Sequence, residues 1–163
     1  MAATLTLRVY TAAGAATQSA AVAGIDFISA DNATNDLANR QANPITVGTA
    51  SYEKWLRLYI DTAPANGVTN FKIWGDGAVQ TSTTLYFTGN YVTGTTPTNA
   101  TSSIAATSFV AYSSSGSAAT WDAASYKTVG SYTKYVVFQL AVGSDCGPGN
   151  WGQETISYSY DET

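Results

Sequence analysis

Histidine is absent from this sequence, and cysteine occurs once, as Cys146. Histidine is the commonest general base and the commonest metal ligand, so its absence excludes Ser-His-Asp and Cys-His catalysis and histidine–zinc sites. A single cysteine forms no intrachain disulfide and leaves no CxxC redox or zinc motif, so we expect an inert thiol. Glycine-rich phosphate-binding motifs are also missing. The sequence therefore predicts no catalytic residue, no metal and no cofactor.

Charged residues are scarce as well, at 11%, with seven basic and eleven acidic side chains and a net charge of -4. Proteins that bind nucleic acid neutralise phosphates with many lysines and arginines, so nucleic acid is not an expected partner. Fully apolar stretches cover only a few residues, against about 18 for a membrane span, and the first 24 residues lack the basic start of a signal peptide. No membrane partner is expected.

What the sequence does contain is apolar and aromatic side chains, at 45% and 12% of 163 residues, enough for one domain with a substantial core. Apolar and polar residues alternate with period two, which is typical of strands with one buried face. The alternation predicts strands at residues 4–10, 25–29, 52–60, 68–74, 83–88, 107–112, 132–142 and 155–160, with a shorter candidate at 45–47.

The strand at 132–142 is apolar on both faces, which predicts a central strand covered on both sides. Helical periodicity is weak, and residues 35–41 and 121–127 hold a turn or two of helix at most. We therefore predict an all-β fold over residues 1–163: a single-domain antiparallel β-sandwich of about eight or nine strands, jelly-roll-like or immunoglobulin-like, with a small barrel as the alternative. Residues 1–24 are expected to form a strand followed by an extended arm. Phe71 and Phe138 are predicted core residues.

A candidate binding face follows if residues 52–60 and 68–74 pair as a hairpin. Matching their apolar sides sets Arg57 opposite Lys72 and Trp55 opposite Trp74, with Tyr59 on the same face. Tryptophan, tyrosine and arginine are enriched at protein-binding hot spots, so this face is a candidate contact with a partner. The alternative is that the face packs against a second sheet or the rim of the core.

Two groups of acidic residues are candidate sites. The run 31–36 (DNATND) offers the oxygen ligands that calcium takes, but it lacks the glycine and distal glutamate of an EF-hand, and a solvated loop is the preferred interpretation. Paired carboxylates for glycoside hydrolysis would have to come from acids such as Asp26, Glu53 and Asp61. Because Asp26 and Glu53 fall on the polar sides of their strands, we expect them at the surface.

Five runs in the first half of the chain resemble the cement, or decoration, proteins of tailed-bacteriophage heads: LRVYT at 7–11, GIDFISADNAT at 24–34, NPI at 43–45, SYEKWLR at 51–57 and NFKIW at 70–74. The resemblance implies a protein without enzymatic activity. It implies the major capsid protein as partner, a position on the outer surface of the capsid, assembly in the host cytoplasm, and a homo-oligomer, often a trimer, that stabilises the head. Residues 12–24 and 30–43, with Arg40, would be arms that lie on the capsid; ordinary surface loops are the alternative.

A competing interpretation is a carbohydrate- or receptor-binding β-sandwich from a phage tail fibre or a secreted protein. Such a module would present exposed, coplanar aromatic rings as platforms for sugars, and Trp55, Trp74, Trp121 and Trp151 are the candidates. An enzyme on a sandwich fold is the third possibility, and it would need a pocket with convergent acids of raised pKa.

Overall fold

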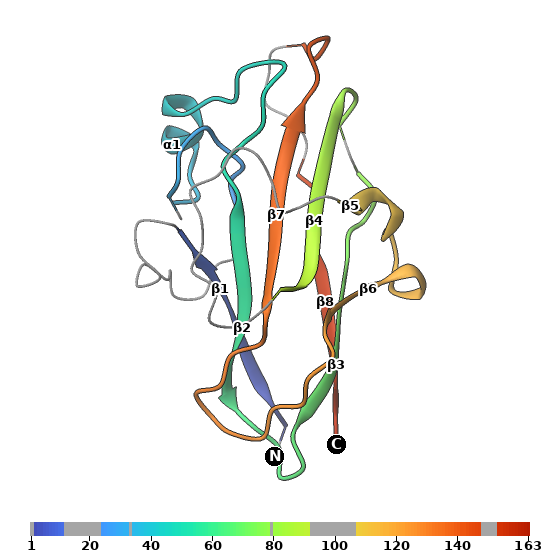
Figure 1. Cartoon of the computed structure of the whole chain (residues 1–163). Coiled ribbons are helices and arrows are strands. Elements are labelled where there is room, and N and C mark those ends of the chain that lie inside the picture. The colour runs from blue at the N-terminus through green and yellow to red at the C-terminus, as the bar shows by residue number, and fades with distance from the viewer. Residues whose placement is uncertain (1, 12–23, 33, 79, 92–106, 148–152) are drawn as a thin grey trace.

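The protein is an all-β sandwich of two antiparallel sheets in a computed structural model (Figure 1), which describes residues 2–11, 24–32, 34–78, 80–91, 107–147 and 153–163. The five-stranded sheet has the order β1-β2-β7-β4-β5 and consists of β1 (Thr4–Tyr10), β2 (Lys54–Thr62), β7 (Tyr135–Val142), β4 (Thr83–Tyr91) and β5 (Thr107–Ser108). The three-stranded sheet has the order β6-β3-β8 and consists of β6 (Ala119–Asp122), β3 (Val68–Trp74) and β8 (Ser157–Glu162).

The core lies between the sheets, where alternate side chains of each strand point inward. Leu56 and Leu58 of β2 meet Phe71 of β3 in one buried cluster, and Phe138 of β7 packs edge-on against Phe109 with ring centroids 5.0 Å apart. Phe71 and Phe138 are both fully buried, as predicted. The inner faces of the strands thus join the two sheets through apolar contacts.

Several predicted elements are confirmed. β1 and β3 have the predicted bounds, and β7 lies between β2 and β4 with most of its residues buried, which confirms the central strand. The short helix α1 (Leu37–Ala42) falls on one of the two predicted helical turns. It begins after Asp36, whose carboxylate accepts a hydrogen bond from the backbone N–H of Asn39, the usual N-cap arrangement.

Other predicted elements are wrong. Residues 25–29 and 45–47 are not strands, residues 107–112 form two strand residues followed by the 3₁₀-helix η1 (Phe109–Ala111), and part of the predicted helical turn at 121–127 is the strand β6. A second 3₁₀-helix, η2 (Ser115–Ser117), precedes β6. Ile25 and Phe27 do pack against the core, but Asp26 and Ile28 are buried too, so this segment is enclosed on both sides without forming a strand ladder. The predicted arm at 12–24 falls almost entirely outside the described residues.

The predicted hairpin between residues 52–60 and 68–74 is also wrong. β2 pairs with β1 and β7, whereas β3 pairs with β6 and β8, so the chain crosses from one sheet to the other between them. Both strands turn an apolar face to the same core from opposite sides, and that pattern is identical to the pattern of a hairpin. Arg57 therefore lies opposite Arg8 rather than Lys72.

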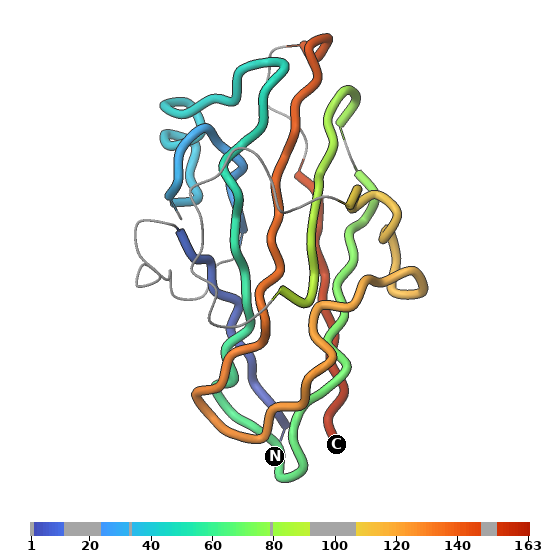
Figure 2. Tube along the Cα trace, in the orientation of Figure 1, coloured from blue at the N-terminus to red at the C-terminus, as the bar shows by residue number. Residues whose placement is uncertain are grey.

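The two ends of the described chain meet at one end of the sandwich (Figure 2). The backbone N–H of Ala3 donates a hydrogen bond of 2.8 Å to the Glu162 carboxylate, and the hydroxyl of Tyr160 donates one of 3.2 Å to the carbonyl of Ala3. These contacts connect the edge strand β1 of one sheet with the edge strand β8 of the other. Among the described residues, no helix has the length and apolar character needed to cross a membrane.

Candidate functional site

Arginine and tyrosine side chains gather on the outer face of the five-stranded sheet, over β1, β2 and the start of β7. Val9 of β1 and Leu56 of β2 point into the core, so their neighbours along each strand point outward. Arg8 and Arg57 lie directly opposite each other in the antiparallel pair of β1 and β2. We call this group the arginine–tyrosine cluster; its members are Arg8, Tyr10, Arg57, Tyr59, Tyr132 and Tyr135.

Each guanidinium group in the cluster stacks on tyrosine rings. The Arg57 Cζ atom lies 4.4 Å from the ring centroid of Tyr10, 4.1 Å from that of Tyr132 and 4.7 Å from that of Tyr135. The Arg8 Cζ atom lies 4.0 Å from the ring centroid of Tyr59 and 5.8 Å from that of Tyr132. All five distances are within the range of cation–π attraction, and Tyr132 is shared by both arginines.

No carboxylate neutralises this pair of cations within the described part of the chain, which contains all eleven acidic residues. Asp61, which follows Tyr59 on the same side of β2, accepts a hydrogen bond from the Thr6 hydroxyl instead. The Nε atoms of Arg8 and Arg57 are buried and have no hydrogen-bond partner. Like charges placed directly opposite in a sheet repel each other, and here the aromatic rings and a hydrogen bond between the Arg57 and Tyr10 side chains offset part of that repulsion.

The two buried tyrosines of the cluster, Tyr10 and Tyr135, do not supply a negative charge. Burial raises the pKa of the Tyr10 and Tyr135 hydroxyls above the usual value, although the nearby Arg57 acts in the opposite direction. Both hydroxyls are therefore neutral at physiological pH. Tyr10 and Tyr135 are buried, whereas Arg8, Arg57 and the two other tyrosines of the cluster are partly exposed.

Two of the six predicted partner-binding residues, Arg57 and Tyr59, belong to this cluster. Trp55 is on the same face but is 1% exposed, and its indole N–H donates a 3.1 Å hydrogen bond to the buried carboxylate of Glu53. Lys72 and Trp74 lie on β3, in the other sheet, and both are partly exposed on its outer side. The predicted single face is thus divided between opposite sides of the sandwich.

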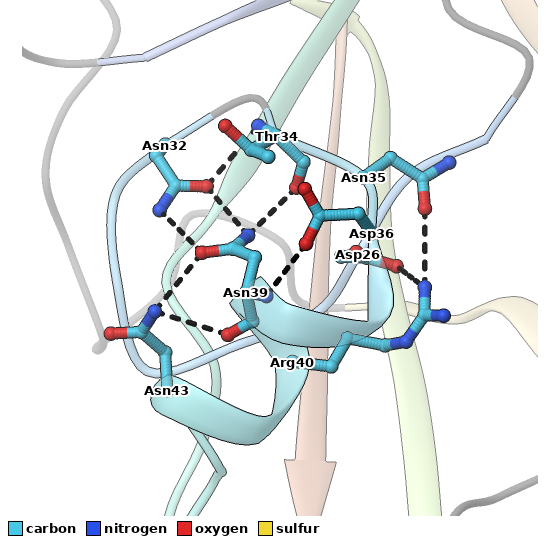
Figure 3. A network of polar contacts seen from close by, with 8 residues as sticks. All are labelled: Asp26, Asn32, Thr34, Asn35, Asp36, Asn39, Arg40 and Asn43. Carbon is cyan, nitrogen blue, oxygen red and sulfur yellow. Dashed lines mark hydrogen bonds and ion pairs between the residues drawn. The ribbon is translucent and has the colours of Figure 1, made fainter.

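The sixth predicted residue, Arg40, belongs to a separate group. This group lies at the end of the sandwich opposite the chain termini, and we call it the polar cap (residues 26–43; Figures 1 and 3). The Nη1 atom of Arg40 lies 2.7 Å from Oδ1 of Asp26 and donates a longer hydrogen bond of 3.3 Å to the Asn35 side chain. The Asp26 carboxylate is 7% exposed and the Arg40 side chain 44%. Arg40 therefore connects α1 with the segment beneath it.

Asn39 is the centre of the polar cap. Its side-chain amide exchanges two hydrogen bonds of 3.0 Å with Asn32, donates to the Thr34 carbonyl, and accepts from Asn43. Figure 3 shows these amides turned toward one another above α1. The interpretation of 30–43 as an extended arm is wrong, because side-chain hydrogen bonds fold this segment onto itself.

A buried lysine supports the polar cap from below. The Nζ atom of Lys54, on the inner side of β2, donates hydrogen bonds of 3.3 and 2.8 Å to the backbone carbonyls of Ala30 and Asn32. Burial lowers the pKa of Lys54 to about 8, and the negative charges of Asp31 and Asp26 act in the opposite direction. The run 31–36, the calcium candidate, thus directs the backbone oxygen of Asn32 at a lysine ammonium group, and the oxygen of the preceding Ala30 points to the same group. The described residues contain no group of three or more His, Cys, Asp or Glu side chains that could hold a metal ion.

The expected surface positions of Asp26 and Glu53 are wrong, since both side chains are buried. The buried Asp26 carboxylate forms an ion pair with Arg40. The buried Glu53 carboxylate accepts a hydrogen bond from the indole N–H of Trp55. Alternation identified Glu53 as a polar position. It did not reveal that the outer face of the five-stranded sheet carries a cluster of buried aromatic side chains.

Sequence reasoning missed Arg8, Tyr10, Tyr132 and Tyr135. The signal for the first two was present, because Arg8 and Tyr10 occupy the polar side of a strand whose bounds were predicted. Their importance depends on which strand lies next to β1, and the predicted hairpin gave β2 a different neighbour. Tyr132 precedes β7 and forms an isolated bridge with Tyr59, a contact without a local sequence signal.

Comparisons with known proteins add no relative: no family model matches the sequence, and no curated protein or solved structure matches it significantly.

Proposed function

We propose that the chain is a non-enzymatic structural protein of a tailed-phage virion, a cement protein that binds the outer surface of the capsid and stabilises the head. The observation that carries this proposal is the arginine–tyrosine cluster, two cations without a carboxylate partner in an acidic chain. Arginine and tyrosine are the residue types that contribute most to protein–protein binding, and a partly exposed cation pair attracts an acidic partner surface. The sequence resemblance supports the same partner, the major capsid protein.

The sandwich suits this role physically. Its two sheets enclose one apolar core, and a rigid domain that binds only the assembled shell stabilises that shell by mass action. The role requires no active site. The homo-oligomer, a trimer in our proposal, would place several copies of the arginine–tyrosine cluster around a symmetry axis of the capsid.

The position of the tryptophans favours this proposal over a sugar-binding module. Trp55 and Trp121 are each 1% exposed, so neither ring can serve as a platform for a sugar. Tyr59 and Tyr132, the ring pair at the exposed part of the cluster, are inclined at 51° and are not coplanar. Trp151 lies outside the described residues, which leaves the partly exposed Trp74 as the remaining candidate.

An enzymatic function has less support. A pocket of about 700 Å³ lies between residues 48–52 and the end of β7, and the polar side chains that line it are those of Ser29, Thr49 and Tyr52. No carboxylate or amine lines it. Burial, with a smaller effect of nearby Asp76, raises the pKa of Glu154, but that carboxylate lies beside Gly75 and does not line this pocket.

The test is sedimentation of the purified protein alone and with phage heads stripped of their outer proteins. We expect a defined oligomer that binds the heads and saturates at a stoichiometry set by capsid symmetry. Two charge reversals on opposite sides of the sandwich form a matched pair: Arg57→Glu should weaken binding, and Lys72→Glu should leave it unchanged. Failure of the wild-type protein to bind heads would overturn the proposal, and a glycan array would then test the sugar-binding alternative.

A further inference from the structure

The two arginines of the arginine–tyrosine cluster are held in place before any partner arrives. Arg8 and Arg57 are directly opposite residues of an antiparallel pair, so their Cβ atoms lie about 5 Å apart. Tyrosine rings stack on both guanidinium groups and restrict their rotation. When a ligand bridges the two guanidinium groups, little side-chain entropy is therefore lost, because both arginines are already ordered.

The two positive charges of Arg8 and Arg57 favour the binding of an anion. The Tyr10 and Tyr135 hydroxyls are neutral, the Nε atoms of both arginines lack acceptors, and neither arginine forms an ion pair with any acid of the chain in its described part. Partial burial weakens the solvent screening that would otherwise mask the repulsion between the two cations. One negative group placed between them would remove the repulsion and gain attraction to both.

The form of the site favours a carboxylate of a protein over the phosphates of a nucleic acid. Planar guanidinium groups match the two oxygens of a carboxylate, and rings of the kind found at binding hot spots surround them. A nucleic-acid site needs further cations in a row, but Arg40 is paired with Asp26, Lys54 is buried beneath the polar cap, and Lys72 lies on the other sheet. The remaining basic residues are Lys127, which is exposed, and Lys134, which donates a hydrogen bond to Asn90.

We propose that Arg8 and Arg57 form a two-arginine clamp for a single carboxylate, the side chain of an aspartate or glutamate on the surface of the partner protein. This inference rests on the proposed function for the identity of the partner, the capsid, but the carboxylate site itself can be tested without it. Arg8 and Arg57 act together, so removing either charge should remove most of the clamp's contribution to binding.

The first experiment measures binding to stripped heads for Arg8→Gln, Arg57→Gln and the double variant, with Lys72→Gln as the matched control. We expect each single variant to bind at least tenfold more weakly, the double variant to be little worse than the singles, and the control to equal the wild type. Added salt should weaken the wild type more than the double variant. Double-variant binding equal to wild type would overturn the clamp while leaving the proposed function intact.

The second experiment needs no capsid. NMR signals of the arginine Nε–H groups and tyrosine rings are followed during titration with sodium acetate, with sodium chloride at equal ionic strength as control and sodium phosphate for comparison. Saturable shifts with acetate, absent in the double variant, support the clamp even if the wild type ignores heads, in which case only the proposed function fails. Shifts no larger than those with chloride, or saturation with phosphate alone, would overturn it.

Folding is checked by thermal unfolding of every variant. Should a glutamine variant fail to fold, Arg8→Lys and Arg57→Lys keep the charge while losing the planar fork, and the clamp predicts that they bind acetate and heads more weakly than the wild type. Lysine variants that fold and bind as well as the wild type would overturn the carboxylate geometry.

Discussion

The polar cap and the arginine–tyrosine cluster both contain arginine side chains, but different groups surround the positive charge in the two regions. In the cap, Arg40 pairs with Asp26 at 2.7 Å, and the ammonium group of Lys54 is held by two backbone carbonyls. In the cluster, Arg8 and Arg57 face each other across tyrosine rings without a carboxylate. An arginine that pairs with a carboxylate of its own chain holds a loop in place, whereas an arginine without a carboxylate in its own chain remains available to a partner protein.

This contrast predicts that the two regions respond oppositely to substitution. Changes in the polar cap should lower the free energy of unfolding and leave binding to a partner alone. Changes in the cluster should lower partner binding and leave stability almost unchanged. Stability measurements on single variants can therefore separate the two kinds of charge before any partner is identified.

The core sets the scale for these measurements and carries the largest expected effect. Phe138 is fully buried between the sheets and packs against Phe109 and Phe87, so Phe138→Ala should lower the free energy of unfolding by about 3 to 5 kcal/mol. Chemical denaturation measures this value. A loss under about 1 kcal/mol would mean that the inner face of β7 is not the centre of the core.

Lys54→Ala should have the next largest effect. The substitution leaves the carbonyls of Ala30 and Asn32 without a donor and opens space beneath the polar cap, with an expected cost of about 3 kcal/mol. Lys127, which is exposed, is the matched control, and Lys127→Ala should change stability by less than about 0.5 kcal/mol. Equal effects of the two substitutions would show that the buried amine does not support the cap.

The same lysine predicts a dependence of stability on pH. Because the pKa of Lys54 falls from its ordinary 10.5 to about 8 in the folded protein, the unfolded chain binds more protons between these two values, and stability rises with pH there. From pH 7 to pH 9 the wild type should gain about 1 kcal/mol relative to Lys54→Met. Staying at or below pH 9 avoids the titration of Tyr10 and Tyr135, whose pKa values are raised. Parallel stability profiles of the two proteins would contradict the lowered pKa.

A smaller effect is expected for the ion pair of the polar cap. The Asp26 carboxylate is nearly buried, but the Arg40 side chain is 44% exposed, and solvent screening reduces the value of such a pair. A double-mutant cycle with Asp26→Asn and Arg40→Gln should give a coupling energy of about 0.5 to 1 kcal/mol. A coupling near zero would mean that the amides around Asn39, not the ion pair, hold the cap together.

The strands were predictable from sequence wherever burial of one face is a local property. Thr4–Tyr10 and Val68–Trp74 alternate cleanly, and their bounds agree with the structure. The sheet to which a strand belongs is not a local property, which is why β2 and β3 were predicted to pair although they lie in different sheets. Residues 25–29 show the complementary failure, since Ile25 and Phe27 contact the core although the segment belongs to no strand ladder.

The candidate site shows the same limit. Arg57 and Tyr59 were selected for their side-chain chemistry, and a cation was predicted opposite Arg57; the structure places a cation there, but it is Arg8 instead of Lys72. The polar cap was not predictable in this way, because two of its backbone carbonyls accept hydrogen bonds from Lys54, which lies on a strand more than ten residues further along the chain. The sequence shows which side chains are charged, but the fold determines which residue lies next to each charge.

The smallest expected effect is also the sharpest test of the contrast between the two regions. Arg57→Gln removes the stacking of one guanidinium group on three tyrosine rings, which together contribute about 0.5 to 1 kcal/mol at a partly exposed site. The same substitution relieves the repulsion from Arg8, which is of similar size. The two contributions have opposite signs, so thermal and chemical unfolding should show a net change within about 0.5 kcal/mol. A large loss of stability would mean that stacking outweighs repulsion and that the cluster is structural, like the polar cap. A gain would mean that the folded protein tolerates an unfavourable cation pair, which is the behaviour expected of a surface built for an anionic partner.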